Sequence, residues 1–325
     1  MLRAAREKLG LTRVTLVAYP DVGSNNADLP RELRGGPKKA TSLERIPDTS
    51  TRFTPEKLLS RTSLVLALTE RSSTAPLKML APKLHFRAAT LPGFSRAMFP
   101  ALRLDFDAVS RRTLEMKQRL DGAESARLEL EAEGHVHVLE LDLRHRHAHA
   151  SDGLIREPGM AANLPSGEAY VVPYEGERRG DPSRSHGTLP VELGGEIVVY
   201  RIEGNCATSV TSQGPVSERE AAAIREEPAY GNIAELGLGV LGEFGIEAVG
   251  SVLLDEKLGL HVAFGRSEHL GGVIAPSAFL DRARVIHVDR VYVPSAQAHV
   301  IVRRVSLRSA DGHETDVIRD GRVIG

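Results

Sequence analysis

The sequence predicts two domains, an α/β domain with a parallel, Rossmann-like sheet at residues 1–122 and a mainly antiparallel, β-rich α+β domain at residues 123–325. The chain has 325 residues, 41% of them hydrophobic, which is enough for two separate cores. Segments typical of helices and strands alternate up to about Gly122, as in an α/β layer. Beyond Ala123 the apolar residues recur with period two, which indicates β-strands.

Short segments of the first domain fit helices and strands packed in layers. Apolar runs without alternation are typical of strands in a parallel sheet that is covered on both faces. Such strands are predicted at residues 14–18, 62–69 and 84–87, with helices at residues 3–9 and 75–81.

A long loop and a long helix complete the predicted first domain. Residues 21–54 are rich in Asn, Pro, Gly and charge, and predict a loop. Their Gly35-Gly-Pro-Lys-Lys segment lacks the Gly-Lys-Ser/Thr ending of a phosphate-binding loop, so nucleotide binding is not expected. From Asp105, an expected N-cap, apolar residues recur at helical spacing until Gly122 ends the helix.

The second domain is predicted as strands with few helices. Residues 127–131 and 135–143 alternate across Glu133-Gly134, which predicts a hairpin. A helix is expected at residues 217–226, and Glu235 is expected to begin another, whose Leu236-Gly-Leu-Gly start permits close backbone approach. The remaining apolar runs predict strands at residues 169–172, 191–203, 248–254, 261–264, 285–293 and 299–305.

The composition argues against several classes of protein. The net charge is -1 and the basic residues are scattered, so no electrostatic footprint for nucleic acid is present. Residues 1–9 are charged, and no apolar run approaches the roughly 18 residues that a membrane span requires. The single cysteine, Cys206, excludes an intramolecular disulfide. We therefore expect a soluble, cytoplasmic protein without nucleic-acid or membrane partners.

An imidazole and a carboxylate stand close together in the run Val285-Ile-His-Val-Asp. In an extended strand His287 and Asp289 project on the same side. Two histidines among four carboxylates suit a hard or borderline divalent metal, and a mixed set this large could hold two ions. The other four members precede this pair in turn-like or Gly-flanked surroundings: Glu168, Glu235, Glu256 and His261.

A second group of histidines is interpreted as surface. Arg144 and Arg146 stand among its members and indicate a solvated strand end, and no carboxylate accompanies it. The group consists of His135, His137, His145, His147 and His149.

Sequence motifs in a fixed order carry a family resemblance. They are Asn163-Leu-Pro-Ser-Gly-Glu-Ala-Tyr, Gly231-Asn-Ile-Ala-Glu-Leu-Gly, Leu254-Asp-Glu-Lys, His261-Val-Ala-Phe-Gly and Ile286-His-Val-Asp. Together they resemble the M29 family of metallo-aminopeptidases, of the aminopeptidase T type. Ser72-Ser-Thr-Ala-Pro-Leu-Lys and Phe86-Arg-Ala-Ala-Thr-Leu-Pro-Gly are similar to the N-terminal domain of that family.

The resemblance implies an enzyme with a two-metal site. Two divalent ions, Zn, Co, Mn or Mg, would activate a water molecule that cleaves the N-terminal residue from a small peptide or amide substrate. Glu235 would be the bridging carboxylate, and the family also implies a homodimer. The implied ligands are Glu168, Glu235, Glu256, His261, His287 and Asp289.

The sequence also departs from the family pattern. The family has a tyrosine where this chain has Glu268, followed by His269, so a phenol donor for the oxyanion is missing at that place. Glu268, His269 and Lys257 are therefore the candidate catalytic residues. The chain is also shorter than typical members at its N-terminal side, which predicts a trimmed first domain.

Two alternatives to the aminopeptidase stay open. Ring-cleaving dihydroxypyridine dioxygenases resemble this family and hold one iron(II) through His and carboxylate ligands. The presence of both Glu168 and Glu235 disfavours that reading, because a mononuclear site does not need so many acids. The second alternative is a catalytically inactive peptide-binding homologue, which Glu268 in place of the tyrosine suggests.

Overall fold

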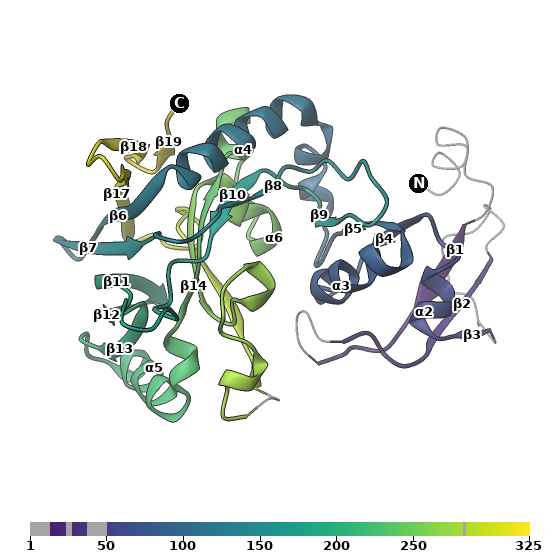
Figure 1. Ribbon diagram of the computed structural model, residues 1–325, viewed down its shortest axis with the longest axis horizontal. Coiled ribbons are helices and arrows are strands. Elements are labelled where there is room, and N and C mark those ends of the chain that lie inside the picture. The colour runs from purple at the N-terminus through teal and green to yellow at the C-terminus, as the bar shows by residue number, and fades with distance from the viewer. Residues whose placement is uncertain (1–13, 24–27, 38–50, 282–283) are drawn as a thin grey trace. The chain divides into compact units, whose positions relative to one another are not determined.

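A computed structural model describes residues 14–23, 28–37, 51–281 and 284–325 of the chain (Figure 1). The chain forms two units, the first made of Met1–Phe94 with Ile155–Leu164 and the second of Ser95–Leu154 with Pro165–Gly325. This division differs from the expected boundary after residue 122. The helix α4 (Phe106–Asp121) belongs to the second unit because it packs against strands of that unit.

The first unit contains a small parallel sheet, as the sequence predicts. Its strands β4 (Leu64–Ala67), β5 (Arg87–Thr90) and β9 (Ala161–Asn163) lie in the order β4-β5-β9. The strand expected at residues 84–87 is wrong, because a helix runs to Leu84 and β5 begins only at Arg87. Helix α3 (Thr74–Leu84) connects the first two strands and covers a core formed by Leu59, Leu77, Ala81, Phe86 and Ala88. The third strand comes from a much later part of the chain, which no local pattern of the sequence indicates.

An antiparallel sheet in the first unit was not predicted. Strands β1 (Thr15–Ala18), β2 (Leu33–Pro37) and β3 (Arg52–Phe53) pair in sequence order, and helix α2 (Pro55–Leu59) follows. The expected loop at residues 21–54 is therefore wrong for the parts that form β2 and β3. The helix expected at residues 3–9 lies outside the described residues.

The second unit is built from two antiparallel sheets, an eight-stranded sheet in the order β13-β12-β11-β7-β6-β17-β18-β19 and a five-stranded sheet in the order β16-β15-β14-β10-β8. The predicted hairpin around Glu133-Gly134 is confirmed by β6 and β7. The larger sheet consists of β6 (Ala123–Ala132), β7 (His135–Asp142), β11 (His186–Leu193), β12 (Glu196–Glu203), β13 (Cys206–Val210), β17 (Val300–Ser309), β18 (Glu314–Arg319) and β19 (Arg322–Val323). The smaller sheet consists of β8 (His149–Ser151), β10 (Glu168–Val171), β14 (Ile233–Gly239), β15 (Leu260–Gly265) and β16 (His287–Val291).

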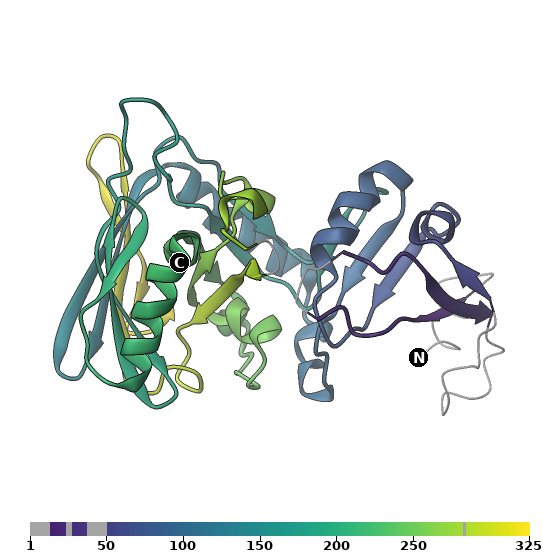
Figure 2. The same cartoon turned by 90° about the horizontal axis from the view of Figure 1, so that it is seen from below.

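The two sheets of the second unit form separate layers with one shared core, as Figure 2 shows. Leu128 and Leu139 of the larger sheet belong to the same buried cluster as Leu236 and Val262 of the smaller one. Helix α5 (Pro215–Glu226) packs on β12 and β13. Short helical segments join the strands: η1 (Arg96–Met98), η2 (Ala101–Arg103), η3 (Pro228–Gly231), η4 (Leu241–Phe244), α6 (Val252–Asp255), η5 (Glu256–Leu258), η6 (Glu268–Leu270) and η7 (Pro276–Ala278).

Helix α4 begins and ends where the sequence predicts. The Asp105 carboxylate accepts hydrogen bonds from the backbone N–H groups of Asp107 and Ala108, and Gly122 is the C-cap residue. The helix lies against β10 and β8, at one side of the smaller sheet.

Three predicted elements of the second unit are wrong. Residues 191–203 are two strands, not one, because Gly194 and Gly195 adopt positive φ angles and form a hairpin turn. The strand expected at residues 248–254 is replaced by a turn and the helix α6, where the Asp255 carboxylate accepts hydrogen bonds from Val249 N and Gly250 N. The helix expected from Glu235 is the strand β14.

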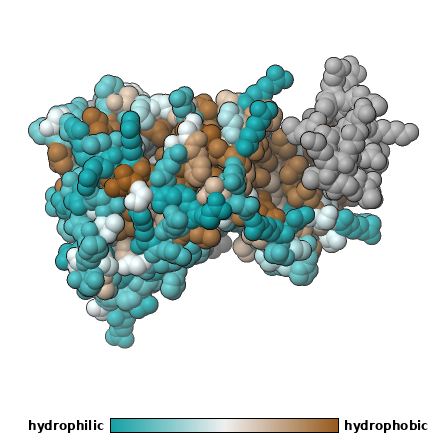
Figure 3. All heavy atoms as spheres, turned by 90° about the horizontal axis from the view of Figure 1, so that it is seen from above, coloured by the Kyte–Doolittle hydropathy of each residue, from teal (hydrophilic) through white to brown (hydrophobic). Residues whose placement is uncertain are grey.

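Hydrophilic side chains cover most of the second unit on the face seen in Figure 3, in keeping with the charged content of 26%. None of the helices in the described residues combines the length and the apolar character that a membrane crossing needs.

Candidate metal centre

The five-stranded sheet presents different residues on its two faces. Successive side chains of a strand point to opposite faces, so one set packs into the core and the other set faces away from it. The core set contains Ala169, Val171, Leu236, Leu238, Leu260, Val262 and Phe264. The opposite set contains Glu168, Tyr170, Glu235, Gly237, Gly239, His261, Ala263, Gly265, His287 and Asp289. The second set holds five of the six predicted ligands, all but Glu256, interspersed with Gly and Ala.

The glycines of β14 make room for this polar layer. A Cβ atom at Gly237 would lie 1.9 Å from Nε2 of His261, and one at Gly239 would lie 2.0 Å from the backbone carbon of Lys257. Any side chain at these positions would therefore collide with the site. The glycines after Glu235, which suggested the start of a helix, lie in a strand instead. They are needed there because His261 and Lys257 pack directly against the backbone of that strand.

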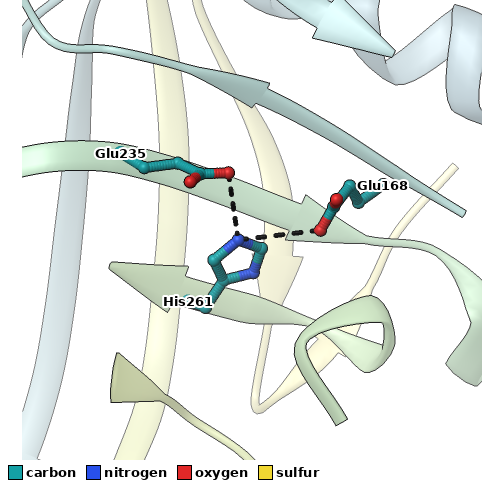
Figure 4. Close-up of side chains that lie close together, drawn as sticks. All are labelled: Glu168, Glu235 and His261. Carbon is teal, nitrogen blue, oxygen red and sulfur yellow. Dashed lines mark hydrogen bonds and ion pairs between the residues drawn. The ribbon is translucent and has the colours of Figure 1, made fainter. Parts of the chain in front are cut away.

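Two overlapping groups of ligand atoms meet at Glu235, which is buried. Glu168, Glu235 and His261 bring ligand atoms within 4.8 Å of one another, and so do Glu235, His287 and Asp289. Figure 4 shows Glu168 and Glu235 pointing at the ring of His261. The two oxygens of Glu235 face different histidines, with Oε1 lying 3.4 Å from Nε2 of His261 and Oε2 lying 3.2 Å from Nε2 of His287.

Glu168 and Asp289 lie slightly further from the histidine rings than Glu235 does. Glu168 Oε2 is 3.7 Å from His261 Nε2, and Asp289 Oδ1 is 3.5 Å from His287 Nε2. Glu168 Oε2 is buried and makes no hydrogen bond within the described part of the chain. A buried carboxylate oxygen without a partner is costly, and a bound cation removes that cost. The donor set of carboxylate oxygens and imidazole nitrogens therefore fits divalent ions at this place.

Backbone carbonyl groups orient both histidine rings. Nδ1 of His261 lies 3.0 Å from the carbonyl oxygen of Glu256, and Nδ1 of His287 lies 2.8 Å from that of Arg266. Because a carbonyl oxygen only accepts, Nδ1 carries the proton in both rings and Nε2 faces the carboxylates. This second hydrogen bond is the arrangement that metal-binding histidines commonly show.

The charges of the cluster act strongly on its members. Burial lowers the pKa of His261, but its hydrogen bond to Glu235 and the charges of Glu235, Glu168 and Glu256 outweigh burial and raise the pKa to about 9. Burial also lowers the pKa of His287. The hydrogen bonds and charges of Asp289 and Glu235 outweigh burial and hold that pKa well above its usual value. A metal ion must displace a proton from each such ring before it binds.

Lys257 lies inside the cluster as a buried cation. Its Nζ is 2.5 Å from Glu168 Oε1, it also donates to Glu256 Oε1, and its side chain is 1% exposed. Glu256 is therefore brought to the cluster through Lys257 and belongs to neither of the two ligand groups. Burial, opposed by the Lys257 charge and reinforced by the charges of Glu168 and Asp289, raises the pKa of Glu256 to about 8. The ligand role of Glu256 stays a prediction.

Glu268 and His269 lie in η6, next to the second ligand group. Glu268 forms a two-pronged ion pair with Arg266, which occupies its carboxylate. The ring of His269 stands edge-on to His287 with centroids 5.1 Å apart, and its Nδ1 is buried without a hydrogen-bond partner among the described residues. Burial and the positive charges of His287 and Arg266 lower the pKa of His269 to about 4. Of the two, His269 is thus the neutral group nearer the ligands.

The segment that carries His269 is held by Glu175, which the sequence did not single out. The buried Glu175 carboxylate accepts hydrogen bonds from Asn232 Nδ2, Ser267 Oγ and Val273 N, at 2.6–2.8 Å, and from Arg146. A Cβ atom at Gly272 would lie 2.3 Å from Ser267 Oγ. The chain from residue 267 to 273 is therefore fixed at both ends against one carboxylate.

Part of the second histidine group borders a cavity. His145, His147 and His149 line a cavity of about 230 Å³ with Arg146, Val172, Leu270 and Gly271. His145 pairs with Asp181 at 3.0 Å, and none of these histidines belongs to a ligand group within the described residues. Sequence reasoning also missed Tyr170, although its position two residues after Glu168 on one strand puts both on the same face.

Comparisons with known proteins support the fold alone. No family model matches the sequence, and no curated protein matches it. The chain is similar to the structure of 2,5-dihydroxypyridine dioxygenase from Pseudomonas putida KT2440, with a TM-score of 0.57 and 18% identity over 83% of this chain and 74% of that one. It is also similar to wild-type AmpT from Thermus thermophilus, with a TM-score of 0.53 and 17% identity over 83% of this chain and 78% of that one. The chain thus has a two-unit α+β fold that is distantly M29-like.

Proposed function

We propose that this protein is a metal-dependent hydrolase of the aminopeptidase type that holds two divalent ions. The observation that carries the proposal is the position of Glu235, whose two carboxylate oxygens face two different histidines. A carboxylate shared in this way by two groups of ligand atoms is what a bridged pair of ions requires. AmpT, the similar M29 aminopeptidase, agrees with this choice.

Five residues would hold the two ions. Glu168 and His261 would bind one, His287 and Asp289 the other, and Glu235 both. Two ions bound here would polarise the carbonyl group of the scissile peptide bond and make a water molecule acidic enough to attack it. Zn, Co and Mn suit a set of imidazole and carboxylate ligands, and Mg suits its oxygen atoms.

The residues of the chain have separate tasks in this reaction. The water oxygen bonds to the carbonyl carbon, the C–N bond breaks, and the leaving amine takes a proton that comes from the water. His269 would accept that proton and pass it to the amine, because its ring is neutral near pH 7 and its Nδ1 makes no hydrogen bond within the described residues. Lys257 donates to Glu168 and Glu256, which limits repulsion among these two, the buried Glu235 and the half-buried Asp289.

A mononuclear iron(II) oxygenase is the second candidate, and one observation favours it. The ammonium group of Lys257 lies 2.5 Å from Glu168 Oε1, which puts a positive charge beside the first ligand group. With Glu168 neutralised in this way, His261, His287 and Asp289 around Glu235 would remain for one iron. The similar dioxygenase structure agrees with this alternative.

Metal analysis combined with a substrate panel tests the proposal. The protein is purified without chelators, its metals are counted, and it is then assayed with amino-acid anilides, dipeptides and dihydroxypyridines. Two ions per chain with release of free N-terminal amino acids supports the hydrolase. One iron per chain with oxygen uptake on a dihydroxypyridine supports the oxygenase. Peptide binding without turnover at full metal occupancy supports the inactive homologue and contradicts both.

The family resemblance also motivates two further parts of the proposal. We expect a homodimer in the cytoplasm, and sedimentation equilibrium tests the dimer directly. A monomer at all concentrations would contradict that part and leave the metal site untouched.

A further inference from the structure

Strand pairing puts Tyr170 and His261 in one row of the polar face. Tyr170 of β10 lies opposite Gly237 of β14, and Gly237 lies opposite His261 of β15. Opposite residues of neighbouring strands project on the same face of a sheet. The row therefore runs from Tyr170 through Gly237 to His261, and its middle member has no side chain.

The ring of His261 occupies the space that Gly237 leaves open. A Cβ atom at Gly237 would lie 1.9 Å from Nε2 and 2.0 Å from Cε1 of His261. The imidazole thus leans over β14 towards the strand that carries Tyr170. No side chain of β14 stands between the phenol and the first ligand group in this row.

A stacked imidazole fixes the other side of the tyrosine ring. His149 of β8 lies opposite Tyr170, and the two rings stack with centroids 5.4 Å apart and planes 26° apart. The tyrosine is 8% exposed. Tyr170 is therefore held between His149 and the ligand groups, close enough to Glu235 and Glu168 for their charges to act on it.

The hydroxyl group of Tyr170 is the exception among the tyrosines of the second unit. Buried tyrosine hydroxyls usually find a hydrogen-bond partner. Within the described part of the chain the Tyr170 hydroxyl makes no hydrogen bond, and because it is not among the fully buried unpaired atoms, it remains accessible to solvent or to a ligand. The hydroxyls of Tyr174, Tyr200, Tyr230 and Tyr292 all donate, respectively to Asp181 O, Glu220 Oε2, Arg284 O and Pro190 O.

We propose that Tyr170 is a catalytic residue whose phenol donates a hydrogen bond to the carbonyl oxygen of the substrate as that oxygen gains negative charge. The inference rests on the proposed hydrolase function. The phenol keeps its proton throughout, so no bond to Tyr170 forms or breaks. A fixed donor of this kind stabilises the transition state more than the bound substrate, because the oxygen carries more charge in the transition state.

The variant Tyr170→Phe tests the assignment, with Tyr200→Phe as the matched control. Each variant loses one phenol hydroxyl from a largely buried tyrosine, but Tyr200 donates to Glu220 from the strand β12 of the other sheet. We expect Tyr170→Phe to lower kcat by about 100- to 1000-fold, with KM changed less than about threefold. Tyr200→Phe should keep the kcat of the unaltered protein.

Two measurements besides turnover separate a catalytic role from a structural one. Metal content should be the same in both variants and the unaltered protein. A phosphonate analogue of the tetrahedral species, titrated by calorimetry, should bind to Tyr170→Phe at least about tenfold more weakly, while the product amino acid binds equally well.

The outcomes are distinguishable. An active unaltered enzyme with an equally active Tyr170→Phe variant overturns the phenol assignment alone, as does a variant that is inactive only because it has lost its metals. An unaltered, metal-loaded protein that cleaves none of the panel overturns the proposed function, and the hydrolytic role of Tyr170 with it.

Discussion

A Cβ atom at Gly237 would lie 1.9 Å from Nε2 of His261, the ring nitrogen that faces Glu235 and Glu168. The missing side chain on one strand is thus what allows a ligand on the next strand to reach both carboxylates. The same strand carries Glu235 two residues earlier, so β14 supplies both a ligand and the space for another.

The variant Gly237→Ala should displace the ring of His261. We expect metal affinity to fall by about 10- to 100-fold, because the ligand can no longer reach its position. Crowding should also destabilise the protein by about 1–3 kcal/mol. Isothermal titration with Zn²⁺ and chemical denaturation measure the two effects. Gly122→Ala is the control, because a Cβ there meets nothing closer than 3.6 Å, and unchanged Zn²⁺ affinity in Gly237→Ala would contradict the account.

The variant Lys257→Met should destabilise the metal-free protein. It removes a buried cation and leaves Glu168 and Glu256 without compensation, which costs about 3–5 kcal/mol. Saturating divalent metal should restore part of that loss, because an ion supplies positive charge at the same carboxylates. Urea unfolding with and without metal measures the difference.

The control for that experiment is Lys117→Met. Lys117 pairs with Asp121 on the surface, with side chains 31% and 29% exposed, and such a pair contributes less than about 1 kcal/mol. A Lys257→Met variant that loses equal stability in both conditions would show that Lys257 has no electrostatic link to the metal centre.

Asp142 should make the stability of the protein depend on pH in the acid range. Burial raises the pKa of this carboxyl, but hydrogen bonds from the Arg144 side chain and from Arg184 N and Arg144 N lower it below its usual value. A depressed folded-state pKa stabilises the fold above the unfolded pKa of about 4, and the contribution is lost as pH falls through the folded value. Asp142→Asn should therefore lose about 1–3 kcal/mol at pH 7 and much less at pH 2. Equal losses at both pH values in metal-free protein would refute this.

The variant His287→Ala should abolish activity and leave the fold intact. The ring lies in the second ligand group and outside the hydrophobic core, so its loss removes a ligand without opening a cavity in the core. We expect turnover to fall by more than about 100-fold, with one ion fewer per chain. His135→Ala, which changes an exposed residue of β7, is the control and should have no effect. Retention of full turnover by His287→Ala would show that the site is misassigned.

Regular periodicity made parts of the fold and of the site predictable. The alternation around residue 287 indicated a strand with His287 and Asp289 on one face, and β16 confirms it. The caps of α4 at Asp105 and Gly122 are chemical signals that act over a few residues, and both are confirmed. Such features can be predicted from the sequence because they depend on neighbouring residues and not on tertiary contacts.

Other features depend on contacts that the sequence does not express. The segment Leu236-Gly-Leu-Gly is compatible with a helix or a strand when only the sequence is considered. The need for glycine there comes from the ring of His261 and the backbone of Lys257, which pack against this segment in the folded protein. The segment 155–164 returns to the first unit through β9, a strand too short to show a period. Glu175 accepts hydrogen bonds from four donors in three parts of the chain, none of them close to Glu175 in sequence.

The central claim is that Glu235 bridges two metal ions. Metal counting on protein saturated with Zn²⁺ or Mn²⁺ and freed of excess ion tests it most directly, for the unaltered protein and for Glu235→Gln. We predict two ions per chain in the unaltered protein. Glu235→Gln should bind both more weakly, because the amide carries no negative charge and keeps only one oxygen that can bind an ion. One ion per chain at saturation, or two ions bound with undiminished affinity by Glu235→Gln, would contradict the account.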